Sequence, residues 1–118
     1  MLYRNRKERA MDRFTSDNYI GKSGICASHK RLEGCSDTHS HEFFELEYIS
    51  GGTGSYTLDG EVYEIHEGMF FLMTPVNFHS VKTSDADLFN VMFSEKICSA
   101  ELLARCTDKK SGLAFEVL

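Results

Sequence analysis

The chain has 118 residues, of which 42% are hydrophobic and 26% are charged, and its formal net charge is -5. This length suits one domain, and the composition is typical of a folded globular protein rather than a disordered one. The negative charge argues against nucleic-acid binding by this chain alone. No apolar run approaches the roughly 20 residues that span a bilayer, so we expect no membrane segment.

The cysteines give an expectation about the compartment. None of the four cysteines belongs to a C-x-x-C pair, and the N-terminus is charged rather than apolar. We therefore expect reduced thiols in a cytoplasmic protein, and no zinc ribbon.

The N-terminal segment, residues 1–20, is polar and charged, so we expect an arm that includes some helix. The stretch GICASHKRL, which starts at Gly24, predicts a first strand. The next predicted strand is FFELEYIS, residues 43–50, whose alternation gives it two faces. One face carries Phe44, Leu46 and Tyr48, and the other carries Phe43, Glu45, Glu47 and Ile49.

The elements that follow are predicted to be short. GGTG, residues 51–54, predicts a turn, and Asp59-Gly60 predicts a two-residue hairpin turn between SYTL and EVYEI. MFFLMTP, residues 69–75, is continuously apolar and predicts a strand buried on both faces. HSVKT and LFNVMFS predict two more strands. This pattern is typical of an all-β antiparallel sandwich or barrel.

Near the C-terminus the pattern changes to a helical period, with Ser94 or Ser99 as the cap. The apolar residues of this predicted helix are Leu102, Leu103 and Cys106. We therefore divide the chain into an N-terminal arm at 1–20, a barrel at 21–94, and a C-terminal helix with the start of a linker at 95–118.

The stretch HSHEFFE, residues 39–45, holds the residues with the clearest chemistry. In a strand His39, His41 and Glu45 share one face, although a bulge would reverse it. His79 is a fourth candidate from a later strand. Imidazole nitrogens with a carboxylate oxygen suit zinc, iron, nickel, copper or manganese. Alternatively, these side chains line a pocket for an organic ligand, or merely sit in a strand.

Two segments of the chain resemble the two motifs of the cupin superfamily. The first, GCSDTHSHEFFELEYISGG, has a glycine, H-x-H, a glutamate and a second glycine. The second, GMFFLMTPVNFHSV, matches at Gly68, Pro75 and His79. The sequence departs at Asn77, where many cupins have glycine, and at Thr83, where asparagine is common.

The resemblance is closer to one branch, the N-terminal sensing domain of AraC-type transcription regulators, and covers roughly residues 23–103. It implies a cupin-like jelly-roll barrel that binds a small effector, often a sugar, and forms a homodimer. It also implies C-terminal helix-turn-helix modules that bind DNA. The acidic 118 residues have no room for these modules, so we expect either a sensor domain or a stand-alone cupin.

Three functions remain open. The first is a non-enzymatic effector-binding domain, with ligand-binding residues expected at His39, His41, Glu45, Tyr48 and His79. The second is a metal-dependent cupin enzyme of the dioxygenase or isomerase class. Its metal ligands would be His39, His41, Glu45 and His79. No further acid–base pair with an evident role supports it. The third is a stand-alone sugar-binding or structural cupin without metal or catalysis, whose aromatic side chains could stack on a ligand; the alternative for these aromatics is core packing. These aromatics are Tyr48, Tyr56, Tyr63 and Phe78.

Overall fold

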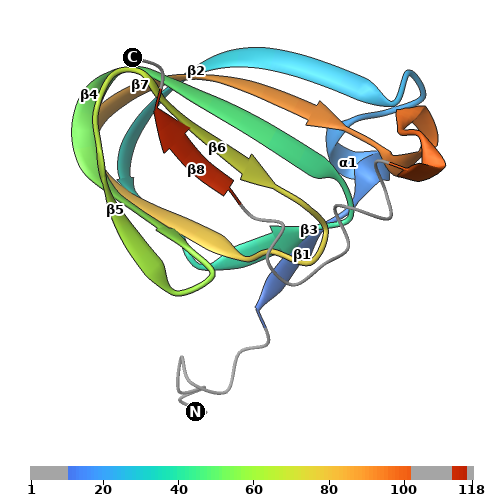
Figure 1. Cartoon of the computed structure of the whole chain (residues 1–118), viewed down its shortest axis with the longest axis horizontal. Coiled ribbons are helices and arrows are strands. Elements are labelled where there is room, and N and C mark those ends of the chain that lie inside the picture. The colour runs from blue at the N-terminus through green and yellow to red at the C-terminus, as the bar shows by residue number, and fades with distance from the viewer. Residues whose placement is uncertain (1–10, 102–112, 117–118) are drawn as a thin grey trace, which may run out of the picture.

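A computed structural model describes residues 11–101 and 113–116 of the chain, and strands make up most of this part (Figure 1). The elements in chain order are β1 Asp12–Phe14, α1 Ser16–Tyr19, β2 Ile25–Cys35, β3 His39–His41, β4 Phe44–Leu58, β5 Glu61–Ile65, β6 Met69–Met73, β7 His79–Phe93, the short 3-10 helix η2 Glu95–Ile97, and β8 Leu113–Glu116. The two long strands, β4 and β7, pair along most of their length, and the other strands add to them.

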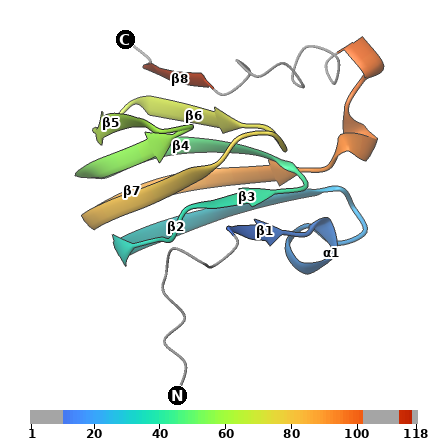
Figure 2. The same ribbon diagram turned by 90° about the horizontal axis from the view of Figure 1, so that it is seen from below.

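These strands belong to one sheet that curls into a barrel. The sheet order is β1-β3-β7-β4-β6-β8, with β2 also paired to β7 and β5 also paired to β4. Each described pairing is antiparallel except that of β1 with β3. Figure 2 shows β4, β5 and β6 on one side, β1, β2 and β3 on the other, and β7 between them. The prediction of an all-β antiparallel barrel is confirmed.

Alternation along the strands decides which side chains fill the barrel. The main buried cluster consists of Ile49, Tyr56, Leu58, Ile65, Met69, Phe71, Met73, Val81 and Leu88. Each such side chain contributes about 1.5–3 kcal/mol when it leaves water. The Tyr56 ring is fully buried and stacks on Phe71, with the ring centroids 3.8 Å apart. Of the four aromatics considered for ligand stacking, Tyr56 is therefore a core residue.

The GGTG stretch is not a turn, because β4 runs through it as one strand. The pairing of β4 with β7 shifts register between Ile49 and Gly51, and again between Thr53 and Ser55. Gly52 has a φ of 93°, and a Cβ atom there would clash with the backbone oxygen of Asp85 on β7. The glycines therefore let β4 bend while it stays close to β7.

Two further strand predictions need correction. HSVKT and LFNVMFS are parts of the single strand β7. In β6, Met69, Phe71 and Met73 are buried, but Phe70 and Leu72 are only partly buried, because one face of the strand points away from the barrel interior. The Asp59-Gly60 hairpin is confirmed, since these two residues have φ values of 50° and 85° between β4 and β5.

The segments on either side of the predicted barrel also contribute strands. Within residues 1–20, β1 pairs with β3, and α1 follows it. At the other end, β8 pairs with β6. The predicted C-terminal helix depends on residues 102–106, which lie outside the described part. Cys26 and Cys35 are free thiols.

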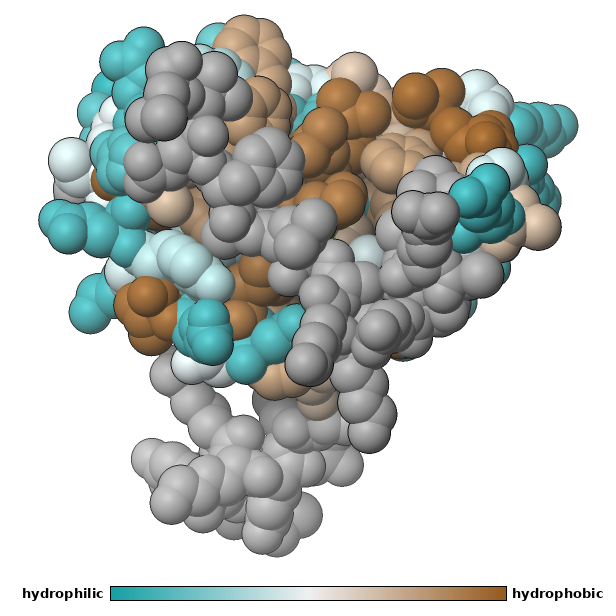
Figure 3. Space-filling model, in the orientation of Figure 1, coloured by the Kyte–Doolittle hydropathy of each residue, from teal (hydrophilic) through white to brown (hydrophobic). Residues whose placement is uncertain are grey.

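The outer face of the sheet carries exposed apolar side chains, with Ile25 at 49% and Phe89 at 48% exposure. Figure 3 shows apolar side chains gathered on this side of the molecule. Across 11–101 and 113–116, no helix has both the length and the apolar character needed to cross a membrane.

Candidate functional site

The structure brings the four predicted metal ligands together. His39 and His41 lie on β3, Glu45 lies on β4, and His79 begins β7 directly opposite His39. The ring centroids of His39 and His79 are 4.2 Å apart, and those of His41 and His79 are 4.9 Å apart. This histidine cluster, defined as His39, His41 and His79, can place three nitrogen atoms within 4.8 Å of one another.

The orientation of His39 is fixed by its surroundings. Its Nδ1 lies 2.9 Å from the backbone oxygen of Asp37, and its ring stacks on Phe14 with the centroids 4.5 Å apart. Because a carbonyl oxygen can only accept, Nδ1 must carry the hydrogen. Nε2 is therefore the ring atom that can face a metal or a ligand donor.

His79 is positioned by the hairpin turn between β4 and β5. The Asp59 carboxylate accepts hydrogen bonds from the Phe78 backbone N–H, at 3.0 Å, and from the Asn77 side chain. The Asn77 side-chain oxygen accepts a bond from the Thr74 N–H at 2.8 Å. The side chain of Asn77, where the sequence departs from the cupin pattern, thus connects the loop before His79 to the hairpin turn.

His79 is a neutral imidazole. Burial lowers its pKa from 6.5 to about 3, assisted by the neighbouring His39 and His41 and opposed by the negative charge of Glu45. Its Nδ1 atom is buried and has no hydrogen-bond partner. A neutral ring with an unpaired nitrogen is the form that binds metals or hydrogen-bonds to a ligand.

His41 and Glu45 are in direct contact inside the barrel. Nε2 of His41 lies 2.6 Å from a carboxylate oxygen of Glu45, and their side chains are 1% and 7% exposed. The other ring nitrogen of His41, Nδ1, is buried and has no hydrogen-bond partner. An unpaired buried nitrogen beside a carboxylate fits a bound metal ion or a polar ligand.

A second carboxyl group, Glu47, lies beside Glu45, although it was not among the site residues predicted from the sequence. Glu47 is 5% exposed, and burial together with the charge of Glu45 raises its pKa well above the usual range. Burial also opposes the ionisation of Glu45, but hydrogen bonding to Glu47 and the nearby His41 and His79 lower its pKa. We infer that the pair holds one proton, mainly on Glu47.

The two-residue spacing of Glu45 and Glu47 was sufficient to identify this pair, since alternate residues of a strand share a face. Asn90 of β7 is the other missed residue. Its side-chain NH2 donates to Glu45 at 2.7 Å and lies 3.4 Å from Glu47. No sequence signal marks Asn90, because its position depends on the pairing of β7 with β4.

A cavity of about 360 Å3 lies next to these side chains. Its polar lining residues are Asp12, Lys30, Ser36, Asp37, His39, Glu45, Glu47, His79 and Asn90. Its apolar and aromatic lining residues are Phe14, Tyr19, Leu32, Phe43, Val81, Leu88 and Met92. The cavity therefore combines one hydrogen-bonding region with apolar walls.

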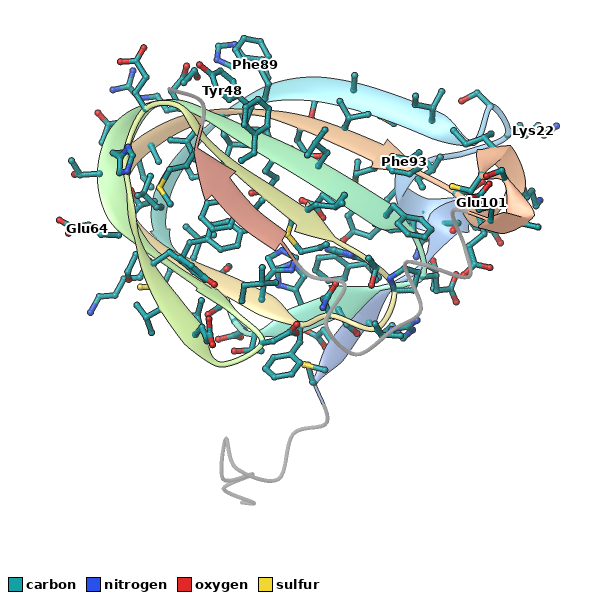
Figure 4. All side chains as sticks on the ribbon, in the orientation of Figure 1. Lys22, Tyr48, Glu64, Phe89, Phe93 and Glu101 are labelled. Atoms are coloured by element: carbon teal, nitrogen blue, oxygen red, sulfur yellow. The ribbon has the colours of Figure 1, made fainter. Side chains whose placement is uncertain are left out.

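The structure does not bring Tyr48 to this cavity. Tyr48 lies on the opposite face of β4 from Glu45 and Glu47, and its ring contacts Phe70 with the centroids 4.7 Å apart. Figure 4 shows Tyr48 near Phe89 on the outer side of the ribbon. Its even position in the strand accounts for this placement.

A curled β-barrel with histidine and carboxylate side chains in its interior defines a protein of the cupin type. Residues 23–114 match the AraC-like ligand binding domain, and the chain belongs to this family. The family resemblance read from the sequence is therefore confirmed, and the chain is a ligand-binding domain of a regulatory family. No match was found among curated proteins.

Solved structures share the fold. A cupin protein from Bacteroides fragilis has a TM-score of 0.58 and 18% identity, with 85% of this chain and 92% of that chain covered. A predicted oxalate decarboxylase from Thermotoga maritima has a TM-score of 0.55 and 20% identity, with 61% and 69% covered. The Bacillus subtilis oxalate decarboxylase has a TM-score of 0.53 and 19% identity, with 64% and 22% covered. These likenesses confirm the cupin-like jelly roll.

Proposed function

We propose that this domain senses a small hydroxylated molecule, such as a sugar, for an AraC-type transcription regulator. The supporting observation is the cavity, which joins apolar walls to a buried group of hydrogen-bonding side chains. Its volume of about 360 Å3 is sufficient for a monosaccharide. In this function the domain is a binding module and not an enzyme.

The polar side chains have complementary roles toward such a ligand. A neutral imidazole, as in His79, both donates and accepts a hydrogen bond, whereas the carboxylate of Glu45 only accepts. His39 offers a free Nε2 at the edge of the same region. Together these groups can orient several hydroxyl groups while the apolar walls cover the rest of the ligand.

The regulatory part of the proposal extends beyond this chain. We expect a homodimer in the cytoplasm that contacts DNA through a helix-turn-helix region outside these 118 residues. Ligand binding changes the DNA-binding state only if the ligand has different affinities for two arrangements of the protein. The acidic domain itself is not expected to contact DNA.

The first experiment measures sugar binding to the chain by calorimetry, with a panel of monosaccharides. We expect binding by the native chain, a loss of about tenfold or more in His79→Ala, whose ring lines the cavity, and no change in His29→Ala. His29 is the matched control because it is exposed and lies on β2 outside the cavity lining. If both variants bound the sugar equally well, the cavity would not be the binding site.

The histidine cluster favours a second candidate, a metal-dependent cupin enzyme. The unpaired nitrogens of His41 and His79 and the free Nε2 of His39 fit a divalent metal, with Glu45 as a fourth ligand. Zinc, nickel, iron or manganese would supply Lewis-acid or redox chemistry there. The Bacillus subtilis oxalate decarboxylase has Mn(II) centres. The Glu45–Glu47 pair adds an acid–base group that was not predicted from the sequence.

Metal content separates the two candidates. The protein is purified without nickel resin, and its bound metals are quantified by mass spectrometry beside a His79→Ala variant. If the protein is a metal-dependent enzyme, the native chain should contain about one metal ion, and His79→Ala should lose it, because neutral His79 would be one of the ligands. A native protein that contains no metal and does not bind the four ions when they are added would contradict this candidate.

A further inference from the structure

The outer side of the barrel carries an apolar patch that crosses four neighbouring strands. Outward positions of β4 lie opposite those of β7 on one side and those of β6 on the other, and β2 continues the rows beyond β7. This outer apolar face consists of Ile25, Ala27, Leu46, Tyr48, Phe70, Leu72, Phe89, Val91 and Phe93. None of these side chains is charged. Two of them, Ile25 and Phe89, are 49% and 48% exposed.

Strand register arranges these side chains in rows. Tyr48 lies opposite both Phe89 and Phe70, and its ring centroid is 4.7 Å from that of Phe70. The next row consists of Ala27, Val91, Leu46 and Leu72. Strands about 4.8 Å apart, with outward residues about 6.8 Å apart along each strand, give a patch of roughly 15 Å in each direction. With its side chains this patch reaches about a few hundred Å2, the size at which apolar surface marks an interaction site.

Polar groups border one end of the outer apolar face, and they are paired within the chain. Nε2 of His29 lies 2.8 Å from the Asp87 carboxylate, which also accepts a hydrogen bond from the Ser50 hydroxyl at 2.7 Å. The Arg31 guanidinium donates to both oxygens of Asp85 at 2.9 Å. Because these charges already have partners, an oppositely charged protein would gain little by binding there. An apolar centre with a polar rim is the usual anatomy of a protein–protein interface.

We propose that the outer apolar face binds a second copy of this chain, so that two sheets pack face to face. This inference rests on the homodimer expected under the proposed function, and it does not involve the ligand cavity. A two-fold axis places each face against itself, and an uncharged apolar surface is complementary to its own copy. Two sheets packed in this way lie about 10 Å apart, with strand directions within about 30° of each other. The polar rim extends the contact toward the roughly 800 Å2 per partner of a stable dimer.

Sedimentation of the full chain over a range of protein concentrations measures the dimer directly. The native chain should sediment as a dimer. Phe89→Asp should raise the dissociation constant about tenfold or more, because its carboxylate would be buried without a partner between the two sheets. Val62→Asp is the matched control, since Val62 is an apolar side chain of β5 that is 69% exposed and lies outside the outer apolar face. Its dissociation constant should equal the native value.

A second variant and a second measurement keep the result interpretable. Ile25→Asp changes the same face on a different strand, and it should weaken the dimer as Phe89→Asp does. Thermal melting checks that each variant folds. Phe89→Asp should still bind sugar in the calorimetric panel, because Phe89 is not a lining residue of the cavity. Sugar binding therefore tests the proposed sensor function separately from the interface.

Three results would overturn this interface. A dimer that neither Phe89→Asp nor Ile25→Asp weakens would place the contact elsewhere and leave the expected homodimer intact. Equal weakening by Val62→Asp would mean that added charge, and not this face, controls association. A native chain that stays monomeric at every concentration would contradict the homodimer as well. If Phe89→Asp then also lowered the melting temperature, residues 102–112 of the same chain would be the occupant of the face.

Discussion

At the scale of single residues, the buried site contains two groups, His79 and Glu47, whose pKa values shift in opposite directions when the chain folds. Burial keeps His79 neutral by lowering its pKa to about 3, whereas burial and the charge of Glu45 raise the pKa of Glu47. In the unfolded chain a histidine titrates near pH 6.5 and a glutamate near pH 4.5. The two side chains therefore make the stability of the fold respond to pH in opposite directions.

We predict these two directions separately. Below pH 6.5 the unfolded chain protonates His79 and the folded chain does not, so His79 lowers the free energy of unfolding as the pH falls toward 3. Above pH 4.5 the unfolded chain ionises Glu47 while the folded chain keeps it protonated, so Glu47 lowers that free energy as the pH rises. Each slope is at most about 1.4 kcal/mol per pH unit.

Urea unfolding of the metal-free protein between pH 4.5 and 8 checks this prediction against His79→Gln and Glu47→Gln. The native chain should lose stability relative to His79→Gln at low pH, and relative to Glu47→Gln at high pH. Glu64→Gln, on the surface of β5, should follow the native curve. Parallel curves for all four proteins would show that folding shifts the pKa of neither buried group.

At the scale of elements, β4 is the strand that joins the two parts of the barrel. It pairs with β6 near one end, with β5 near the other, and with β7 throughout. It can do so because it bends at Gly52 and Gly54, where the β7 backbone lies too close for a side chain. The glycine-rich sequence predicted a turn instead, because such stretches are typical of turns as well as of bends within strands.

The prediction at this scale concerns two adjacent glycines. Gly52→Ala should lower the free energy of unfolding by about 3 kcal/mol or more, because its φ is positive and its new Cβ would clash with Asp85. Gly51→Ala should change it by less than about 1 kcal/mol, since nothing lies within 4 Å of a Cβ there. Chemical denaturation measures both. Equal losses would mean that β4 does not bend at Gly52.

At the scale of the whole molecule, the sequence predicted those features that depend on local pattern. The barrel class and the Asp59-Gly60 hairpin follow from alternation and turn chemistry, and His39 and His41 share a face through their two-residue spacing. Glu45 lies on the next strand, β4, and not on the strand of the two histidines. The role of Asn90 could not be predicted, because it lies 43 residues from Glu47 and meets it only through strand register. A ligand-binding role for Tyr48 could have been excluded from the sequence, because Tyr48 lies on the opposite face of the strand from Glu45.

Side chains of β7 alternate between the inner and outer faces on each side of a register shift, with Val81 and Thr83 buried before it and Leu88 and Asn90 buried after it. This alternation has a consequence for how the domain can change during evolution. His79 and Asn90 reach the site from this strand, while Phe89 between them points to the outer face. A single inserted or deleted residue would exchange the inner and outer side chains over the rest of the strand. Substitution at inward positions changes only one contact. We therefore expect related domains to diversify their ligands by point substitution, with the length of this strand unchanged.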